Sequence, residues 1–334
     1  MADTALGGTA AIGCGVIGAG WVARLRLNGV DVRTYDPSPH AERIIDTVHQ
    51  NALLAWQELD LEPAADTIGT LTVCDSIERA VDGAELVIES VPERLDAKHA
   101  TLSAIDTASS PTTIIASSTS GFRPSQLAEP LSHPERLIVG HPFNPVYLLP
   151  LVEVVGGQHT DEGIVHRALD IYRSLGMHPL RVRAEIDAHI ADRLLEAVWR
   201  EALWLIEDGV ATTEEIDDAI RFGFGLRWAQ MGLFETYRIA GGEGGMRHFI
   251  GQFGEALTWP WTKLMDVPEL TEELIDTIAT QSDEQSGHLD IRELERIRDR
   301  NVAAMMLALE RNGWGAGETV AAMRARSGRS ADHR

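Results

Sequence analysis

The sequence predicts an α/β protein in two parts, a parallel sheet covered by helices on both faces and then an all-α domain. Three observations predict this fold. Short apolar runs alternate with helical patterns as far as about residue 184. A glycine-rich turn stands between the first apolar run and the first helical one. After Glu185 the periodicity is helical to about Ala325, and no strand pattern returns.

The first part begins with a short strand over 9–12 and a helix over 21–28, which Gly29 ends. A second strand covers 30–35, and a long amphipathic helix covers 41–59. Four further apolar runs are predicted to be buried strands: 71–74, 86–90, 114–117 and 137–140. Strands separated by helices pair in parallel, so this part is predicted to be a Rossmann-type domain over residues 1–186.

The second part is predicted to be an all-helical domain over residues 187–326. A helix over 188–208 opens it. The next helix begins at Thr213-Glu214-Glu215, because carboxylates are favoured in the first turn of a helix. The polar segment 327–334 is predicted to be a disordered tail.

The composition excludes several classes of partner. The chain has 334 residues and a net charge of −22, which repels nucleic acid and anionic membranes. No run approaches the roughly 18 apolar residues that a membrane span requires, and the first residues carry no basic secretory region. Only Cys14 and Cys74 occur, which indicates a reducing compartment without disulfides. The sequence therefore predicts a cytoplasmic protein without metal, membrane or nucleic-acid partners.

The glycine-rich turn predicts a dinucleotide site, because a strand precedes it and a helix follows it. Gly13 permits the tight turn, Gly15 lets the backbone approach a pyrophosphate, and Gly18 lets helix and strand pack closely. Val16 and Ile17 stand at the start of the helix, where free backbone N–H groups and the helix dipole favour phosphates.

Asp36 at the end of the second predicted strand selects the form of the cofactor. Its carboxylate can accept hydrogen bonds from the ribose hydroxyls of an adenosine. A 2′-phosphate would meet a like charge there, and no arginine follows closely. The sequence therefore predicts NAD rather than NADP. The alternative is a glycine-rich turn followed by a surface aspartate.

A histidine and a glutamate form the candidate catalytic pair. His141 follows the apolar run 136–140, so it lies at the carboxyl edge of a strand, where ligands bind in open α/β sheets. Glu153 stands inside the apolar run 149–155, and an acid in such a strand needs a partner. Neutral histidine can take the proton of an alcohol as hydride leaves, and a carboxylate can orient its ring. From spacing alone, the alternative of a structural histidine beside an edge-strand glutamate stays open.

With these motifs the chain resembles the 3-hydroxyacyl-CoA dehydrogenase family over nearly its whole length. The residues that carry the resemblance are the glycine-rich turn, an H-x-F-N-P segment at His141 with Glu153 twelve positions on, Ser118-Thr119-Ser120, and Glu93 with Lys98. The resemblance implies that Ser120 contacts the substrate oxygen, His141 is the base and Glu153 its partner. It places Glu93 and Lys98 on the nicotinamide and ribose side of the cofactor. It also implies a homodimer formed by the helical domain.

Within the family the chain is similar to the branch that acts on small free hydroxy acids, and most of all to enzymes that oxidise L-carnitine. The segments that carry this similarity are 15–24, 225–232, and 235–237 with the glycines that follow. Residues 41–97 contain no lysine, whereas the acyl-CoA enzymes carry a lysine-rich helical hairpin there. The resemblance therefore implies NAD-dependent oxidation of the C3 hydroxyl of L-carnitine to 3-dehydrocarnitine.

Carnitine carries a quaternary ammonium group, which aromatic faces and negative charges recognise. Phe143, two residues from the base, is predicted to line the substrate site, and Ala188, Ile190 and Ala191 are expected to be its small or apolar walls. Asp192 stands where the family has asparagine. We expect it to supply charge toward a cationic substrate or a hydrogen bond to the catalytic pair. The alternative is a carboxylate that only complements the helix dipole.

Three other functions stay open. The first is oxidation of L-gulonate or another small 3-hydroxy acid, for which more hydrogen-bonding side chains and fewer aromatic rings would be needed around the pocket. The second is oxidation of a 3-hydroxyacyl-CoA, which the missing lysines oppose. The third is a crystallin-like structural protein or an NAD-sensing protein without catalysis. The intact set of Ser120, His141 and Glu153 argues against that third class.

Overall fold

The computed structural model describes residues 6–61, 63, 67–240, 245–253, 261–263, 269, 271–274, 276, 277, 280, 288 and 291–326. The chain divides into two compact units. The first contains the described residues up to Asp192, together with 296–312 and 316–326. The second contains the described residues of 193–295, together with 313–315.

An eight-stranded sheet forms the centre of the first unit. Its strands are β1 (Thr9–Ile12), β2 (Val32–Tyr35), β3 (Leu71–Val73), β4 (Leu86–Glu89), β5 (Ile114–Ser117), β6 (Leu137–Pro142), β7 (Leu151–Gly156) and β8 (His178–Val182). Their order across the sheet is β3-β2-β1-β4-β5-β6-β7-β8. Neighbouring strands are parallel except β6 and β7, which are antiparallel. β1, β4 and β5 are buried along their whole length, as expected of central strands between two helical layers.

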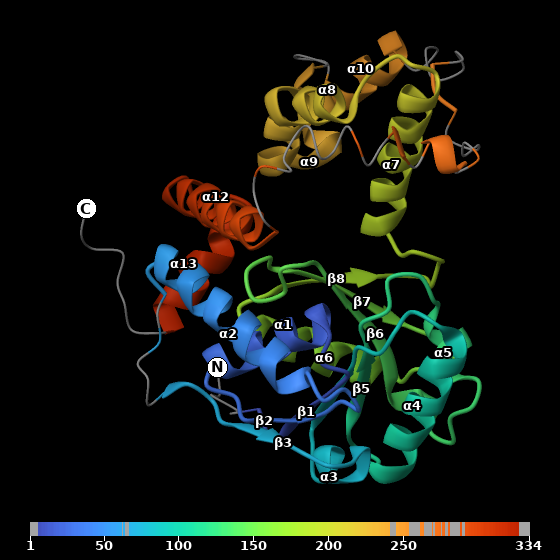
Figure 1. The fold of residues 1–334 in the computed structure, drawn as a ribbon, viewed down its shortest axis with the longest axis vertical. Helices are drawn as coiled ribbons and strands as arrows, with labels where there is room; N and C mark the ends of the chain where they lie inside the picture. The colour runs from blue at the N-terminus through green and yellow to red at the C-terminus, as the bar shows by residue number, and fades with distance from the viewer. Residues whose placement is uncertain are drawn as a thin grey trace. The chain divides into compact units, whose positions relative to one another are not determined.

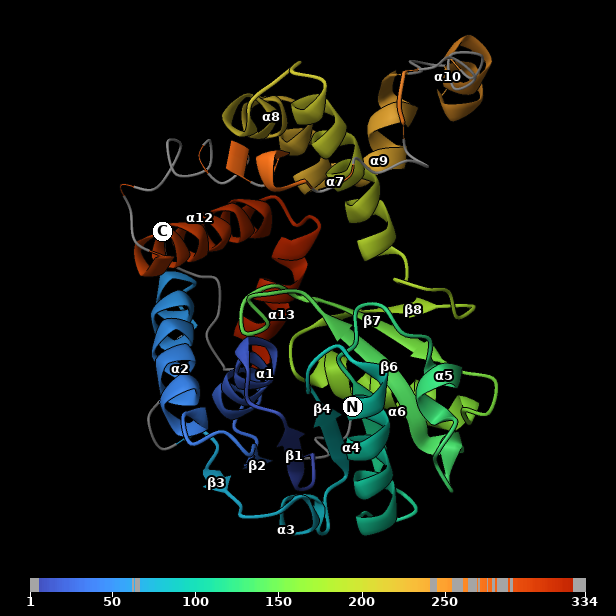
Figure 2. The same ribbon diagram turned by 45° about the vertical axis from the view of Figure 1, so that its right-hand side comes forward.

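Helices cover both faces of the sheet (Figure 1, Figure 2). One face packs against α1 (Val16–Leu27), α2 (Ala41–Glu58) and α6 (Glu162–Ser174), in a core that includes Trp21, Ile45 and Tyr172. The other face packs against α3 (Ile77–Val81), α4 (Leu95–Ala108) and α5 (Pro124–Ala128), and the 3₁₀ turn η2 (Pro134–Arg136) leads into β6. The predicted fold class, a mostly parallel Rossmann-type sheet domain with a helical C-terminal region, is confirmed.

The predicted ends of the first elements agree closely with the structure. Gly29 ends α1 with a φ of 77°, a left-handed conformation that glycine adopts without strain. α2 ends at Glu58, one residue before the predicted end. The sequence does not predict β8, because Pro179 and Arg181 interrupt its apolar pattern. β8 is an edge strand, and proline is tolerated at the edge of a sheet.

Two C-terminal helices pack with the first unit. α12 (Ile291–Arg311), from residue 296 on, and α13 (Ala316–Arg326) form a core with α1 and α2 that includes Ala52, Met306 and Val320. The domain limits at 186 and 187 remain a prediction, and these two helices were expected to belong to the helical part. Contacts between residues about 250 positions apart leave no trace in local periodicity, so the sequence could not reveal this packing.

The second unit is helical. It contains α7 (Ala191–Glu207) from residue 193 on, α8 (Thr213–Ala219), the π-helical turn η3 (Ile220–Phe224), α9 (Gly225–Ala240) and α10 (Gly245–Phe253). Thr212 and Glu215 form a capping box at the start of α8, which explains the helix that the sequence predicts there. The predicted disordered tail 327–334 lies outside the described residues. Among the helices that the structure describes, none combines the length and hydrophobicity needed to cross a membrane.

The predicted start of the first C-terminal helix at residue 188 is wrong. α7 begins at Ala191, because Ala188 and His189 have φ angles of 60° and 49°. Non-glycine residues with such angles cannot continue a right-handed helix. This left-handed turn positions the residues that follow it, and it borders the candidate active site.

Candidate active site

The glycine-rich turn joins β1 to α1, and two of its glycines have no room for a side chain. Gly13 has a φ of 89°, and a Cβ there would lie 2.7 Å from a backbone oxygen of the segment after β4. A Cβ on Gly18 would lie 1.8 Å from the carbonyl oxygen of Gly13. Gly15 is different, because among the described residues no heavy atom other than those of its chain neighbours lies within 4 Å of the position of its Cβ. This open space beside the backbone is where a pyrophosphate would fit, so the residues present are compatible with a dinucleotide.

The start of α1 and the end of β2 border the same turn. The first N–H groups of the helix, at Val16 and Ile17, have no partner within it and can meet an anion. Asp36 accepts hydrogen bonds from Cys14 N at 2.6 Å and from Ser38 N at 2.7 Å, so its carboxylate is held at the edge of the turn. Burial raises the pKa of the Cys14 thiol to about 11, which makes it unreactive.

Lys98 lies buried on α4 between two carboxylates. Its Nζ is 2.9 Å from Glu89 Oε1 and 3.2 Å from Glu93 Oε2, and it donates to Val91 O at 3.3 Å. Glu89 is itself fully buried at the end of β4 and also accepts a hydrogen bond from Ser117 Oγ. All three N–H groups of Lys98 are therefore directed at protein acceptors. The prediction that Lys98 contacts the cofactor stays a prediction, and in this arrangement it supports Glu93.

Glu93 ties the segment after β4 to the loop after β5. It accepts hydrogen bonds from Thr119 Oγ1 and from Gly121 N. Burial alone would raise the pKa of Glu93, but the hydrogen bond from Thr119, the charge of Lys98 and the bond from Gly121 lower it. Ser120 stands between the two anchored residues and is half-buried. None of the described residues hydrogen-bonds its hydroxyl, which leaves that group available to a ligand.

His141 and Glu153 lie directly opposite each other on the antiparallel strands β6 and β7. Residues paired in this way place their side chains on the same face of the sheet, about 5 Å apart at Cβ. His141 Nδ1 lies 3.0 Å from Glu153 Oε2, and both side chains are buried. The twelve-residue spacing therefore reflects the hairpin of β6 and β7, which brings Glu153 back to a position opposite His141.

The second oxygen of Glu153 holds the start of α7. Oε1 accepts hydrogen bonds from Ile190 N at 3.0 Å and from Ala191 N at 3.1 Å. Burial alone would raise the pKa of Glu153, but the hydrogen bonds from His141, Ala191 and Ile190 and the charge of His141 lower it. An ionised Glu153 can only accept a hydrogen bond, so Nδ1 carries the ring proton and Nε2 of His141 is the basic atom.

Three side chains surround the imidazole of His141. The Phe143 ring lies 5.0 Å from it between ring centroids, and the His189 ring lies 5.4 Å from it. Asp192 Oδ2 lies 3.7 Å from His141 Nε2. The predicted residues Phe143 and Asp192 are therefore beside the candidate base.

The remaining predicted wall residues act through their backbones in the structure. Ile190 and Ala191 donate to Glu153, and Ala188 N donates to Gly121 O at 3.1 Å. Ala188 thereby ties the turn before α7 to the loop that contains Ser120. The roles predicted for these site residues in binding and catalysis remain predictions that the geometry allows.

Sequence reasoning missed two residues of this cluster. His189 is fully buried, its Nε2 lies 3.3 Å from Thr119 O, and burial and the charge of His141 lower its pKa. A single histidine in a linker gives no signal of such a position. Glu89 could have been found, because it ends an apolar run in the way that Glu153 interrupts one.

Comparison with known families matches both parts of the chain. The model described as the NAD binding domain of 3-hydroxyacyl-CoA dehydrogenase matches residues 8–186. The model of the C-terminal domain of 3-hydroxyacyl-CoA dehydrogenase matches residues 189–286. The predicted NAD cofactor is in agreement with the first of these matches.

Individual relatives cover most of the chain. A protein of Agrobacterium fabrum named "L-carnitine dehydrogenase/betainyl-CoA thioesterase" is 62% identical over 94% of this chain and 64% of its own length. A protein of Mesorhizobium japonicum named "L-carnitine dehydrogenase" is 57% identical over 92% of this chain and 86% of its own length. The chain thus spans about 64% of the length of the first of these relatives and all but a small part of the second.

A solved structure has the same architecture. The NAD+-dependent 5-dehydrogenase of 5-formyl-3-hydroxy-2-methylpyridine 4-carboxylic acid superposes with a TM-score of 0.72 at 28% identity. The match covers 97% of this chain and all of that one. The arrangement of a sheet unit followed by helices is therefore shared over the full length.

Proposed function

The chain belongs to the 3-hydroxyacyl-CoA dehydrogenase family, and from that premise we propose that it oxidises the C3 hydroxyl of L-carnitine to 3-dehydrocarnitine with NAD. The observation that carries the proposal is the buried His141–Glu153 contact in a chain 52–62% identical to proteins named for carnitine dehydrogenation. The lack of lysine in residues 41–97 supports a small substrate rather than an acyl-CoA.

In the proposed reaction C3 of the substrate loses a hydride and its hydroxyl loses a proton. NAD supplies the hydride acceptor when it is bound at the glycine-rich turn, with Asp36 at its adenosine ribose. His141 Nε2 takes the proton. Glu153 keeps Nδ1 protonated and stabilises the imidazolium that results. Ser120, in the loop that Glu93 holds, contacts the substrate oxygen.

The experiment that tests this function compares substrates in parallel. NADH formation is followed by absorbance with L-carnitine, L-gulonate and 3-hydroxybutyryl-CoA. We expect kcat/KM for L-carnitine to exceed the other two by at least about 10²-fold, because buried polar and charged groups built for one substrate reject others strongly. A higher value with L-gulonate or with the acyl-CoA would contradict the proposed substrate. Binding of NAD without turnover of any substrate would favour a binding protein.

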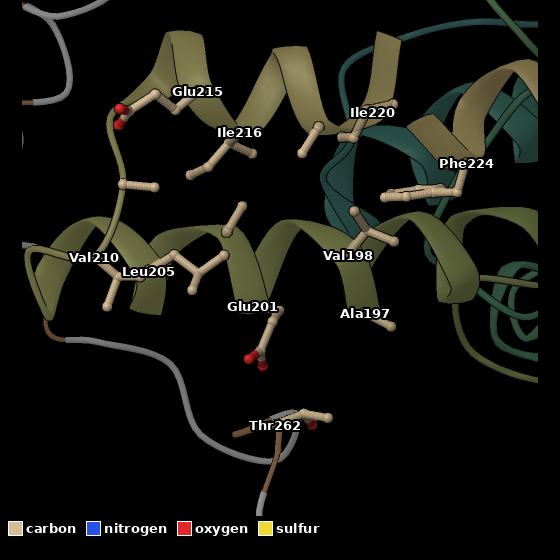
Figure 3. Close-up of a pocket in the computed structure, with 13 residues that line it drawn as sticks. Ala197, Val198, Glu201, Leu205, Val210, Glu215, Ile216, Ile220, Phe224 and Thr262 are labelled. Carbon is tan, nitrogen blue, oxygen red and sulfur yellow. The ribbon is translucent and has the colours of Figure 1, made fainter. Parts of the chain in front are cut away.

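A homodimer formed by the helical part is also proposed. In the second unit an apolar cavity of about 450 Å³ lies between α7 and α8 (Figure 3). Val198 of α7 and Ile216 of α8 point into the gap between the two helices, while Glu201 points away from this gap toward Thr262. Large exposed apolar surfaces mark protein interfaces, and a second copy of the chain is the occupant we propose for this one.

The oligomeric state follows from that proposal. Phe222 and Phe234 of the same unit are 77% and 73% exposed in the single chain. Such exposed rings support an interface that a second copy of the chain covers. We expect light scattering after gel filtration to give about twice the mass of 36.5 kDa. A mass of one chain at micromolar concentration would contradict the dimer.

A cytoplasmic location is proposed from the cysteines. Cys14 and Cys74 are both unpaired in the structure, and Cys14 is buried. Free cysteines are usual in reducing compartments. Recovery of the native protein mainly from a secreted or periplasmic fraction would contradict this location.

A further inference from the structure

The two nitrogens of the candidate base each face a carboxylate. Glu153 Oε2 lies 3.0 Å from Nδ1, on the side away from the reacting hydroxyl. Asp192 Oδ2 lies 3.7 Å from Nε2, which is the atom that receives the proton. Orienting the ring requires only the first of these contacts. The second places a negative charge beside the position of the substrate, where it can act on the imidazolium or on a cationic part of the substrate.

Asp192 is held in this position by the anchored start of α7. Ile190 N and Ala191 N both bond to Glu153, so the backbone immediately before Asp192 is fixed to the partner of the base. The left-handed turn at Ala188 and His189 directs these N–H groups inward. The Asp192 side chain is 21% exposed, which is low for a carboxylate at a helix start. A carboxylate that only complemented the helix dipole would not need to be directed at Nε2.

The geometry of the proposed substrate brings a cation to the same place. A hydroxyl that gives its proton to Nε2 lies about 3 Å from it. In L-carnitine one methylene joins the quaternary nitrogen to the carbon that bears this hydroxyl, which puts nitrogen and oxygen about 3–4 Å apart. A carboxylate next to Nε2 is then within the ~4–6 Å at which opposite charges interact strongly.

Charge is the main means of holding such a group. A quaternary ammonium has no N–H to donate, so it cannot form a hydrogen bond with an acceptor. Only negative charge and aromatic faces attract it. The Phe143 ring, 5.0 Å from the His141 ring between centroids, can supply such a face. The other arm of carnitine is a carboxylate, which Asp192 and Glu153 would repel. The two arms are therefore distinguishable at this site.

We propose that Asp192 is the specificity-determining residue that holds the trimethylammonium arm of the substrate and thereby fixes which arm lies on which side of His141. The inference rests on the proposed function. Exchanging the two arms while hydroxyl and hydrogen stay in place gives the mirror-image substrate. Asp192 accordingly also favours L- over D-carnitine.

The test compares the cation with a neutral molecule of the same shape. The carbon isostere of carnitine is 3-hydroxy-5,5-dimethylhexanoate, in which a quaternary carbon replaces the nitrogen. We measure kcat/KM for both compounds with the wild-type protein, Asp192→Asn and Asp192→Glu. In Asp192→Asn we expect about a 10- to 100-fold lower kcat/KM for L-carnitine, mainly through KM, and an unchanged or higher value for the isostere. Asp192→Glu retains the charge and should recover part of the preference for the cation.

Asp187→Asn is the matched control. Asp187 lies five residues earlier, is 76% exposed and pairs with Arg123 at 3.1 Å. The same loss of charge at Asp187 should leave the ratio of kcat/KM for L-carnitine to kcat/KM for the isostere unchanged. Thermal melting and NAD titration verify that each variant is folded and binds cofactor.

Each remaining outcome contradicts a defined statement. If Asp192→Asn lowers kcat/KM for both compounds equally, Asp192 acts on His141 or on the fold and does not recognise the trimethylammonium group. If it changes neither value, Asp192 has no role in recognition. If the wild-type protein does not turn over L-carnitine at all, the proposed function fails and this inference fails with it. If the wild-type protein turns over L-carnitine, and Asp192→Asn leaves the ratio of kcat/KM for L-carnitine to kcat/KM for the isostere unchanged, the inference fails while the proposed function stands.

Discussion

Replacing His141 by alanine should lower the turnover of L-carnitine by about 10²–10⁴-fold, the usual loss when a general base is removed. Its Nδ1 is held by Glu153 at 3.0 Å, which makes Nε2 the atom that accepts the hydroxyl proton. NAD binding should be retained, because the glycine-rich turn follows β1 and Asp36 follows β2, and these strands lie three and four positions from β6 in the order of the sheet. Steady-state kinetics and an NAD titration on one preparation separate the two effects.

The chain contains a matched control for this variant. His166 on α6 also pairs with a glutamate, Glu162, at 3.2 Å, but the two side chains are 62% and 58% exposed. His166→Ala removes a histidine from a His–Glu pair that has no relation to the site, and it should turn over L-carnitine at the wild-type rate. If His141→Ala retained turnover within about threefold of the wild type, another group would have to be the base.

The glycine-rich turn, Asp36 and the central strands could be predicted, because each leaves a local pattern. Gly13 and Gly18 occur where backbone crowding forbids any side chain, so only glycine can stand there. β4 and β5 are buried on both faces, and such strands appear in the sequence as continuous apolar runs. Each of these features leaves its mark in a short stretch of sequence, which is why the sequence reveals it, although the atoms that crowd Gly13 belong to the segment after β4.

The sequence suggests that His141 pairs with Glu153, but it does not show how the fold brings the two residues together. The sequence shows two polar residues at apolar strands, and it does not show that β7 runs antiparallel to β6 with these two residues in register. The start of α7 was misplaced for a related reason. Ala188 and His189 are ordinary residues by helix propensity, and contacts with Gly121 and Thr119 support their left-handed conformation. Tertiary contacts of this kind override local preference.

Replacing Glu153 by glutamine should cost about 10²–10⁴-fold in turnover, although the side chain keeps its shape. Glu153 accepts from three donors: His141 Nδ1, Ile190 N and Ala191 N. A glutamine has only one oxygen for these donors. If its oxygen stays with the backbone N–H groups, its NH₂ faces Nδ1, and His141 must carry its proton on Nε2, where it cannot act as a base. If the amide turns round, the NH₂ opposes two N–H donors and releases the start of α7.

The control for this variant is Glu162→Gln, in the exposed pair on α6. It makes the same chemical change without a buried donor on either side, so turnover and stability should stay close to those of the wild type. Turnover of Glu153→Gln at the level of Glu162→Gln would show that Glu153 does not set the tautomer of His141.

The same glutamine variant has an expected pH signature in stability. Hydrogen bonds from His141 and the start of α7 outweigh the effect of burial and lower the pKa of Glu153 below the ordinary carboxyl value of about 4.3. As the pH falls through that value the unfolded chain binds a proton that the folded chain does not. The contribution of Glu153 to stability is therefore complete at higher pH and is lost as the pH falls through the pKa of the folded state. Glu153→Gln has no carboxyl to titrate there. In urea unfolding below about pH 5, its free energy of unfolding should fall less steeply with pH than that of the wild type, and equal slopes would contradict an ionised, hydrogen-bonded Glu153.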